Sequence, residues 1–205
     1  MTMQMNRFFA AAAALFCLGA ISYAVEPASV NLGDSAVTPA WNQSETTDFE
    51  PALYRAAERG DFNKVKQLVE QGADVNQTTD EGETPLHAVA DEGRLEIAKF
   101  LIEKGAKVNA ADEDGVTPLH EAASSGNLDM VKLLVDSNAN VNAADHDSET
   151  PLHVAAEDST VEIVKYLVEH KADISAKDED GRTALEIAKK HNRADIAAYL
   201  ESVSK

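Results

Sequence analysis

Three histidines and several groups of acidic residues are the side chains whose type and spacing could perform chemistry. The histidines are His87, His120 and His153, which recur at intervals of 33 residues. To bind zinc, their ring nitrogens would have to lie about 2.0–2.1 Å from one ion. Equivalent residues of stacked helical units are instead roughly 8–10 Å apart, the distance between packed helices. We therefore predict no metal site here, and expect each histidine to orient its helical unit through hydrogen bonds within and between units.

The acidic groups recur at the same interval, and several begin like a calcium-binding loop, with the pattern Asp-x-Asp-Gly. Their residues are Asp80, Glu81, Asp112, Glu113, Asp114, Asp145, His146, Asp147, Asp178, Glu179 and Asp180. An EF-hand also requires a bidentate glutamate at its twelfth position, where this chain has Ala123 or Lys189. We therefore predict no cofactor, and weak calcium binding by the pooled carboxylates is the alternative.

The sequence lacks the motifs of common catalytic sites. There is no glycine-rich phosphate loop and no His-Glu-x-x-His motif, and the single cysteine, Cys17, lies in a segment that we expect to be removed. Carboxylates are plentiful, but general acid–base catalysis needs a carboxyl group whose pKa is shifted by burial beside a partner. A thin stack of helices encloses little space, so the sequence predicts a protein that is not an enzyme.

The elements that carry these residues are defined by a repeated Thr-Pro-Leu-His motif. The motif and its weaker terminal copies lie at residues 51–54, 84–87, 117–120, 150–153 and 183–186. Threonine is a good N-cap and proline suits the first helical position, so each intact motif predicts the start of a short helix. Apolar residues with helical periodicity follow in each unit, and they predict a second helix with one buried face.

This signature resembles that of the ankyrin repeat, and the resemblance covers residues 50–205, within a predicted ankyrin-repeat domain at residues 49–205. It implies an all-α fold, a solenoid of about five helix-turn-helix repeats with short hairpin loops. The predicted repeats are 50–78, 79–111, 112–144, 145–177 and 178–205. Lys64 and Glu201 replace apolar residues of the internal repeats, as expected of terminal repeats that have one side facing water.

The fourth predicted repeat departs most from the others. Where the other repeats have glycine or asparagine, we expect left-handed backbone, which most residues adopt only with strain. The fourth repeat has Ser148, Ser159 and Lys171 at these positions. We therefore predict that residues 145–177 open more readily than residues 112–144.

The first 24 residues differ in composition from the rest of the chain. Arg7 precedes an apolar run at residues 8–21, and small residues precede a possible cleavage site after Ala24. This pattern predicts a signal peptide at residues 1–24, because the apolar run is shorter than the roughly 20 residues of a membrane-spanning helix. An uncleaved anchor is the alternative. Residues 25–48 lack periodicity and predict a disordered linker. The mature chain, without cysteine, suits an oxidising compartment, so we expect a periplasmic or secreted protein.

The net charge of −18 makes nucleic acid and membrane surfaces unfavourable partners. The resemblance implies a protein partner bound on a concave face of loop tips and first helices, and the charge predicts that this partner has a basic surface. The predicted partner-binding residues are Asp80, Glu81, Asp91, Glu92, Asp112, Glu113, Asp114, Glu121, Asp145, His146, Asp147, Glu157, Asp158, Asp178 and Glu179. Basic residues flank this set in the terminal repeats. We therefore predict a monomeric binding module of the periplasm, and a secreted effector acting on host proteins is the alternative.

Overall fold

The structure, a computed structural model, describes residues 51–204. The predicted signal peptide and linker lie outside the described residues. Within residues 51–204 the chain forms ten α-helices and no strand. They are α1 (Ala52–Glu58), α2 (Phe62–Glu70), α3 (Pro85–Asp91), α4 (Leu95–Glu103), α5 (Pro118–Ser124), α6 (Leu128–Asp136), α7 (Pro151–Asp158), α8 (Val161–Glu169), α9 (Ala184–Lys190) and α10 (Ala194–Val203).

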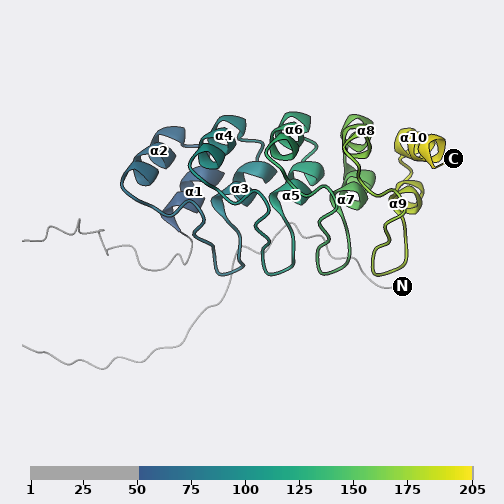
Figure 1. Cartoon of the computed structure of the whole chain (residues 1–205), viewed down its shortest axis with the longest axis horizontal. Coiled ribbons are helices and arrows are strands. Elements are labelled where there is room, and N and C mark those ends of the chain that lie inside the picture. Colours follow the sequence, from purple (N-terminus) through teal and green to yellow (C-terminus); the bar gives the residue numbers. More distant parts are fainter. Residues whose placement is uncertain (1–50, 205) are drawn as a thin grey trace, which may run out of the picture. The chain divides into compact units, whose positions relative to one another are not determined.

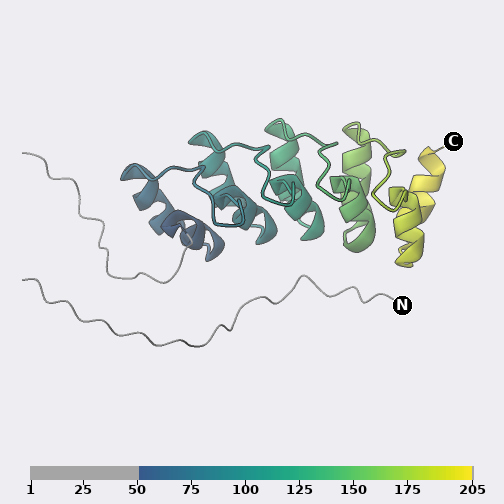
Figure 2. The same ribbon diagram turned by 90° about the horizontal axis from the view of Figure 1, so that it is seen from below.

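The helices pack as five hairpins that stack side by side in chain order. Each odd-numbered helix packs against the even-numbered helix that follows it, and each also packs against the corresponding helix of the next hairpin. The odd-numbered helices therefore form one layer and the even-numbered helices a second, with the connecting loops projecting beyond the first layer (Figures 1 and 2). The predicted all-α stack of about five repeats is confirmed.

The three intact Thr-Pro-Leu-His motifs start α3, α5 and α7 as predicted. In the first motif the Thr84 amide donates a hydrogen bond to Nδ1 of His87 at 3.0 Å. Because Nδ1 accepts, Nε2 carries the proton, and it donates to the carbonyl oxygen of Val116 in the next repeat at 3.1 Å. Burial lowers the pKa of His87, which favours this neutral form. The hydrogen bonds predicted within and between repeats are present for all three histidines.

The core is a continuous row of apolar side chains between the two layers. Leu101, Leu134 and Leu167 occupy equivalent positions in successive second helices, and each is fully buried. No hairpin encloses such a core alone, so each repeat depends on its neighbours for burial of its apolar residues. Lys64 and Glu201 are both exposed, in agreement with the expected terminal repeats.

Asparagine side chains join successive repeats at the ends of the second helices. The Asn109 side chain donates to the carbonyl oxygen of Asn138 at 3.0 Å and accepts from the Asn140 amide at 2.7 Å. Asn76 and Asn142 make the same pair of bonds in the repeats before and after. These bridges fix the distance between neighbouring hairpins where the chain leaves each second helix.

The fourth repeat has left-handed backbone at two of the three predicted positions. Ser148 has φ 61° and Lys171 has φ 72°, as expected from their glycine counterparts. The expectation for Ser159 is wrong, because its backbone is extended, with φ −97° and ψ −161°. Helix α7 is one residue longer than α3 or α5 and ends at Asp158, directly before the position at which the second and third repeats turn through Gly93 and Gly126.

Candidate functional site

The first-helix face is the surface formed by α1, α3, α5, α7 and α9 with the loops that precede α3, α5, α7 and α9. The predicted helical residues all reach this surface: Asp91, Glu92 and Asp158 are exposed, whereas Glu121 and Glu157 are partly buried. The predicted loop residues that are exposed are Asp80, Glu81, Glu113, Asp114, His146, Asp147 and Glu179. These five helical residues and seven loop residues account for twelve of the fifteen residues predicted to bind a partner.

The other three, Asp112, Asp145 and Asp178, hold their own loops. Oδ1 of Asp145 accepts hydrogen bonds from the amides of Asp147 at 3.0 Å and Glu149 at 2.8 Å, and Asp112 makes the equivalent pair. These bonds close the tight turn at each loop tip. One carboxylate oxygen of each of the two aspartates is therefore engaged within its own loop and not with a partner.

Asp178 requires a correction. Its side chain is fully enclosed, because Arg182 covers it and forms an ion pair with Oδ2 at 2.7 Å. Arg182 also pairs with the exposed Asp180 at 2.9 Å. A partner therefore cannot reach the Asp178 carboxylate without displacing Arg182, and we remove this residue from the predicted binding set.

Backbone hydrogen bonds hold the loop tips in a row. The amides of Glu113, His146 and Glu179 donate to the carbonyl oxygens of Glu81, Asp114 and Asp147, respectively, at 2.8–3.0 Å. Each loop is thereby tied to the loop before it. The acidic side chains at the tips consequently recur at a regular interval along the stack.

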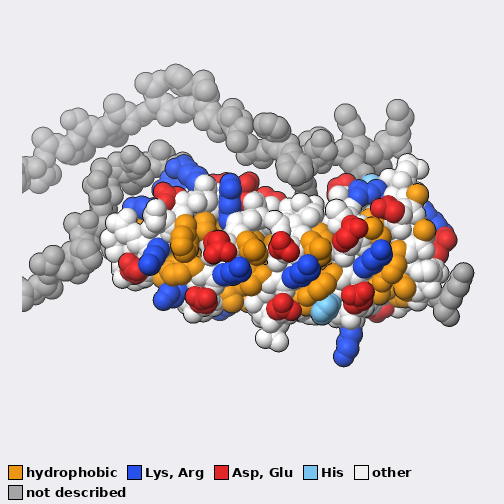
Figure 3. Space-filling model, turned by 90° about the horizontal axis from the view of Figure 1, so that it is seen from above, with side chains coloured by type: hydrophobic (Ala, Val, Ile, Leu, Met, Phe, Trp, Pro, Cys, Tyr) orange, Lys and Arg blue, Asp and Glu red, His pale blue; other side chains and the backbone are white. Residues whose placement is uncertain are grey.

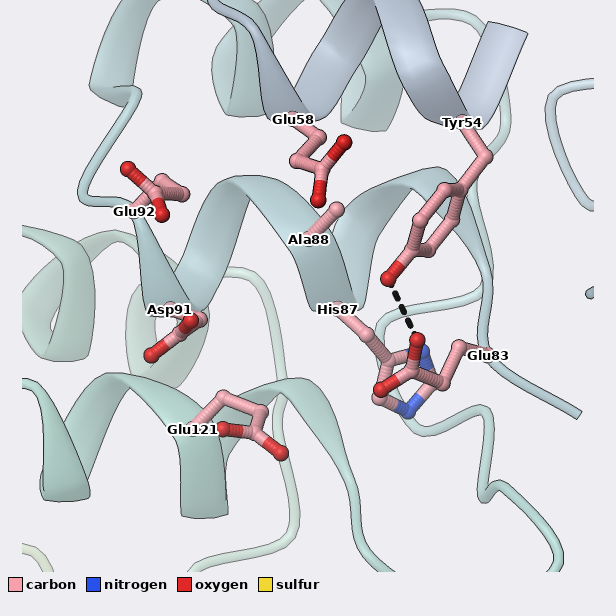
Figure 4. Close-up of a pocket in the computed structure, with 8 residues that line it drawn as sticks. All are labelled: Tyr54, Glu58, Glu83, His87, Ala88, Asp91, Glu92 and Glu121. Atoms are coloured by element: carbon pink, nitrogen blue, oxygen red, sulfur yellow. Dashed lines mark hydrogen bonds between the residues drawn. The ribbon is translucent and has the colours of Figure 1, made fainter. Parts of the chain in front are cut away.

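A pocket brings part of the predicted set together at the first three repeats (Figure 4). It is lined by Tyr54, Glu58, Glu83, His87, Ala88, Asp91, Glu92 and Glu121. Five of these eight residues are acidic and none is lysine or arginine. Of the predicted residues, Asp91, Glu92 and Glu121 line it, and Figure 4 shows their carboxylates around the same opening as that of Glu58.

The hydroxyl of Tyr54 donates to a carboxylate oxygen of Glu83 across this pocket. Tyr54 stands where the next three repeats have their motif histidine, and it contacts a side chain where those histidines contact a backbone carbonyl. The sequence reasoning missed Tyr54, Glu58 and Glu83. The first copy of the motif, residues 51–54, has tyrosine in place of histidine. This substitution was the available signal that the first repeat makes a different contact.

The carboxylates of the pocket repel one another and are partly withdrawn from water. Burial raises the pKa of Glu83, and the nearby charges of Glu81, Asp112 and Asp91 add to the effect, against the hydrogen bond from Tyr54. Burial raises the pKa of Asp91 too, followed by the charge of Glu92. A cation placed among these groups would favour their ionised forms, so the pocket has the chemistry to accept a positively charged group.

A second group of carboxylates lies at the fourth repeat, around Glu149, which sequence reasoning also missed. Burial raises the pKa of Glu149 to about 7, and the charges of Asp145, Glu157, Asp178 and Asp147 contribute in that order. The basic residues predicted in the fifth repeat are partly paired within the chain, since Lys189 forms an ion pair with Glu201 at 2.6 Å. Glu157 lies 3.5 Å from His191.

The opposite face, formed by the even-numbered helices, has a different charge pattern. Basic and acidic side chains alternate across it, with apolar side chains between them (Figure 3). Lys99 pairs with Glu96 at 3.2 Å and Lys132 with Asp129 at 3.7 Å. Glu96 and Asp129 on this face thus have lysines beside them, whereas the pocket on the first-helix face has none in its lining.

Among residues 51–204 there is no group of three or more His, Cys, Asp or Glu side chains placed to hold a metal ion. No helix in the same range is long and apolar enough to cross a membrane. The family model "Ankyrin repeats (3 copies)" matches residues 53–145 and 141–203. No curated protein matches the chain.

Proposed function

The chain belongs to the ankyrin-repeat family, and we propose that it is a non-enzymatic periplasmic module that binds a protein with a basic surface through its first-helix face. Ankyrin repeats suggest protein–protein interaction, and no enzyme family matches the chain. The observation that carries the choice of partner is the pocket of Figure 4, where three successive repeats contribute five carboxylates without a lysine or arginine in the lining.

The physical basis of recognition is charge complementarity supported by an aromatic contact. Exposed ion pairs contribute only about 0–1 kcal/mol each, so a stable complex needs several of them together with a better-buried anchor. Tyr54 is 8% exposed and borders the pocket, so its ring can flank the aliphatic part or the charged end of a basic side chain. Long-range attraction should also accelerate association, and salt should reduce that effect steeply.

The periplasmic location rests on the composition of residues 1–24, which lie outside the described structure. Fractionation of the native organism tests it, with detection of the chain in periplasm, cytoplasm, membrane and culture fluid. Recovery from the periplasm with residues 1–24 removed supports the proposal. Recovery from culture fluid alone would favour the secreted effector.

Charge reversal tests the binding face. The variant Asp91→Lys, Glu92→Lys, Glu157→Lys and Asp158→Lys should keep the fold, because none of these side chains is fully buried and lysine has a good helix propensity. A partner isolated on residues 25–205 should then bind at least about tenfold more weakly at low salt, as expected for the loss of several ion pairs.

The matched control reverses four exposed acids of the opposite face, Glu103, Glu162, Glu169 and Asp195. It makes the same change in net charge, and it should leave affinity within about twofold if recognition is local. Equal losses in both variants would mean that net charge alone governs binding. Affinity unchanged by the first variant would place the binding surface elsewhere.

A further inference from the structure

Two buried histidines act as hydrogen-bond acceptors at the starts of their helices. Nδ1 of His87 accepts from the Thr84 amide at 3.0 Å, and Nδ1 of His120 accepts from the Thr117 amide at 3.1 Å. The two histidines are 1% and 2% exposed. Protonation would place a hydrogen on Nδ1, opposite an amide that can only donate. The threonine hydroxyls, 2.8–2.9 Å from the same nitrogens, can rotate to accept, but the amides cannot.

The same rings also join successive repeats. Nε2 of His87 donates to the carbonyl oxygen of Val116, and Nε2 of His120 donates to that of Glu149, both at 3.1 Å. A protonated ring that leaves the helix start to reach water loses this bond together with the bond at Nδ1. Acid therefore breaks one contact within a repeat and one contact between repeats at the same time.

Burial keeps the two rings neutral against several nearby acids. It lowers the pKa of His87 and of His120, and it outweighs the hydrogen bond that each ring makes to a backbone carbonyl. Asp112 faces both rings and Asp145 faces His120, and their charges favour protonation. Glu83 and other acids line the pocket of Figure 4 together with His87. The ring of His120 disfavours protonation of His87.

The fifth repeat has glutamate at the position of these histidines. Oε2 of Glu186 accepts from the Thr183 amide at 2.7 Å and from the Thr183 hydroxyl at 3.0 Å. The hydrogen bonds from Thr183 lower the pKa of Glu186 below its usual 4.5. The start of α9 therefore keeps its acceptor at a pH at which an exposed histidine is already protonated.

We propose that His87 and His120 cause the second and third repeats to open on mild acidification, while the start of α9 remains capped. Opening of these two repeats dismantles the pocket of Figure 4, because six of its eight lining residues belong to them. The proposal concerns the stability of the stack and does not depend on the proposed binding function.

The direction of the pH effect follows from the proton affinity of the two states. The pKa of each histidine is lower in the folded chain than its ordinary value of 6.5, so the unfolded chain binds the proton more tightly. The stability that the neutral rings provide is fully present above pH 6.5. It is lost as the pH falls from 6.5 through the lowered value of the folded chain. Glu83, Asp91 and Glu149, whose pKa values are raised, act in the opposite direction.

The experiment compares the full chain with the double variant His87→Gln and His120→Gln. Glutamine at this position can accept the threonine amide bond and does not titrate. Site-resolved hydrogen exchange over residues 79–144, corrected for intrinsic rates, measures opening of both proteins at pH 7.5 and 5.5. The ratio of the two openings removes the effect of the acids that both proteins share.

We expect the opening of the unmodified chain, relative to the double variant, to rise by about tenfold or more between pH 7.5 and 5.5, since 5.5 is one unit below the pKa of an unperturbed histidine. His170→Gln is the matched control, because His170 is exposed at the end of α8 and its Nδ1 contacts a carbonyl oxygen, that of Tyr166, at 2.7 Å. The same ratio taken against this control should change by less than about twofold.

Nuclear magnetic resonance of the imidazole nitrogens gives a second test, which needs no variant to fold. The rings of His87 and His120 should remain neutral in the folded chain at pH 5.5. Protonation of either ring while the amides of residues 79–144 stay protected overturns the proposal. It is also overturned if the opening ratio against the double variant stays constant within about twofold, or if His170→Gln changes the pH dependence as much as the double variant does.

Discussion

The third and fourth repeats share one backbone plan and differ in how their turns are built. At four equivalent positions the third and fourth repeats have, respectively, Gly115 and Ser148, Val116 and Glu149, Gly126 and Ser159, and Asn138 and Lys171. The fourth repeat nevertheless keeps the left-handed backbone at Ser148 and Lys171. The comparison shows that contacts with adjacent repeats can impose a strained conformation that the local sequence disfavours.

At Ser159, by contrast, the fourth repeat leaves its first helix with a different backbone conformation from that of the third repeat. Where the third repeat turns at Gly126, the fourth continues into extended backbone, and Arg193 of the fifth repeat donates to the carbonyl oxygen of Glu157 at 3.0 Å and to that of Ser159. The hydroxyl of Ser159 is buried and has no partner. The end of α7 is thus stabilised by the neighbouring repeat, at the cost of one unsatisfied polar group.

Removal of this support should have the largest effect on stability. Arg193→Ala leaves carbonyl oxygens at the end of α7 without their charged donor, and hydrogen bonds to charged groups contribute about 1.5–3 kcal/mol. We expect the free energy of unfolding to fall by about 2 kcal/mol in urea denaturation.

Arg94→Ala is the matched control, because Arg94 has the equivalent position in the second repeat and pairs with Glu92 at an exposed site. Its loss should be about 0–1 kcal/mol. Similar losses for the two variants would contradict a special dependence of the fourth repeat on its neighbour.

Transfer of the fourth repeat's glutamate into the third should produce a smaller, pH-dependent effect. Val116→Glu places a carboxyl group beside Asp112, so its pKa should be raised as that of Glu149 is, and the stability that its proton provides should be lost as the pH rises from 4.5, the value of an unperturbed glutamate, through the raised value. Relative to Val116→Gln, which controls for lost apolar contacts, we expect a penalty of about 1 kcal/mol or slightly more at pH 8 and nearly none at pH 5. Parallel urea-denaturation profiles of the two variants from pH 5 to 8 would refute this expectation.

Relief of backbone strain in the fourth repeat should have the smallest effect. Lys171→Gly removes the side chain from a left-handed residue, which should raise the free energy of unfolding by about 1 kcal/mol. Asn138→Gly should change stability less, since asparagine tolerates this conformation. Hydrogen exchange should show residues 145–177 less protected than 112–144 in the unmodified chain, with the difference reduced in Lys171→Gly. Better protection of residues 145–177 at the outset would contradict the predicted weakness.

The sequence was sufficient to predict many features that depend on the 33-residue period, although the same reasoning failed at Ser159 and did not predict the asparagine bridges. Repeat number, helix starts, the histidine contacts and the left-handed residues at 148 and 171 all follow from equivalent positions. Contacts between unlike side chains of different repeats were not predictable in this way. Arg182 covering Asp178, Arg193 supporting α7 and Tyr54 contacting Glu83 each depend on one residue that departs from the repeat. The period describes what the repeats share, whereas the candidate site is built from their differences.

The asparagine bridges restrict how such a chain can change in length during evolution. Asn109 binds residues 29 and 31 positions further along the chain, and Asn142 does the same in the next repeat. Insertion of one residue between such partners would separate a donor from its acceptor. Deletion of residues 112–144 would instead bring Asn109 to Lys171 and Asp173, the residues that Asn142 now binds. Gain or loss of whole 33-residue units therefore preserves the bridges, and growth by duplication is the change that this architecture accommodates most easily.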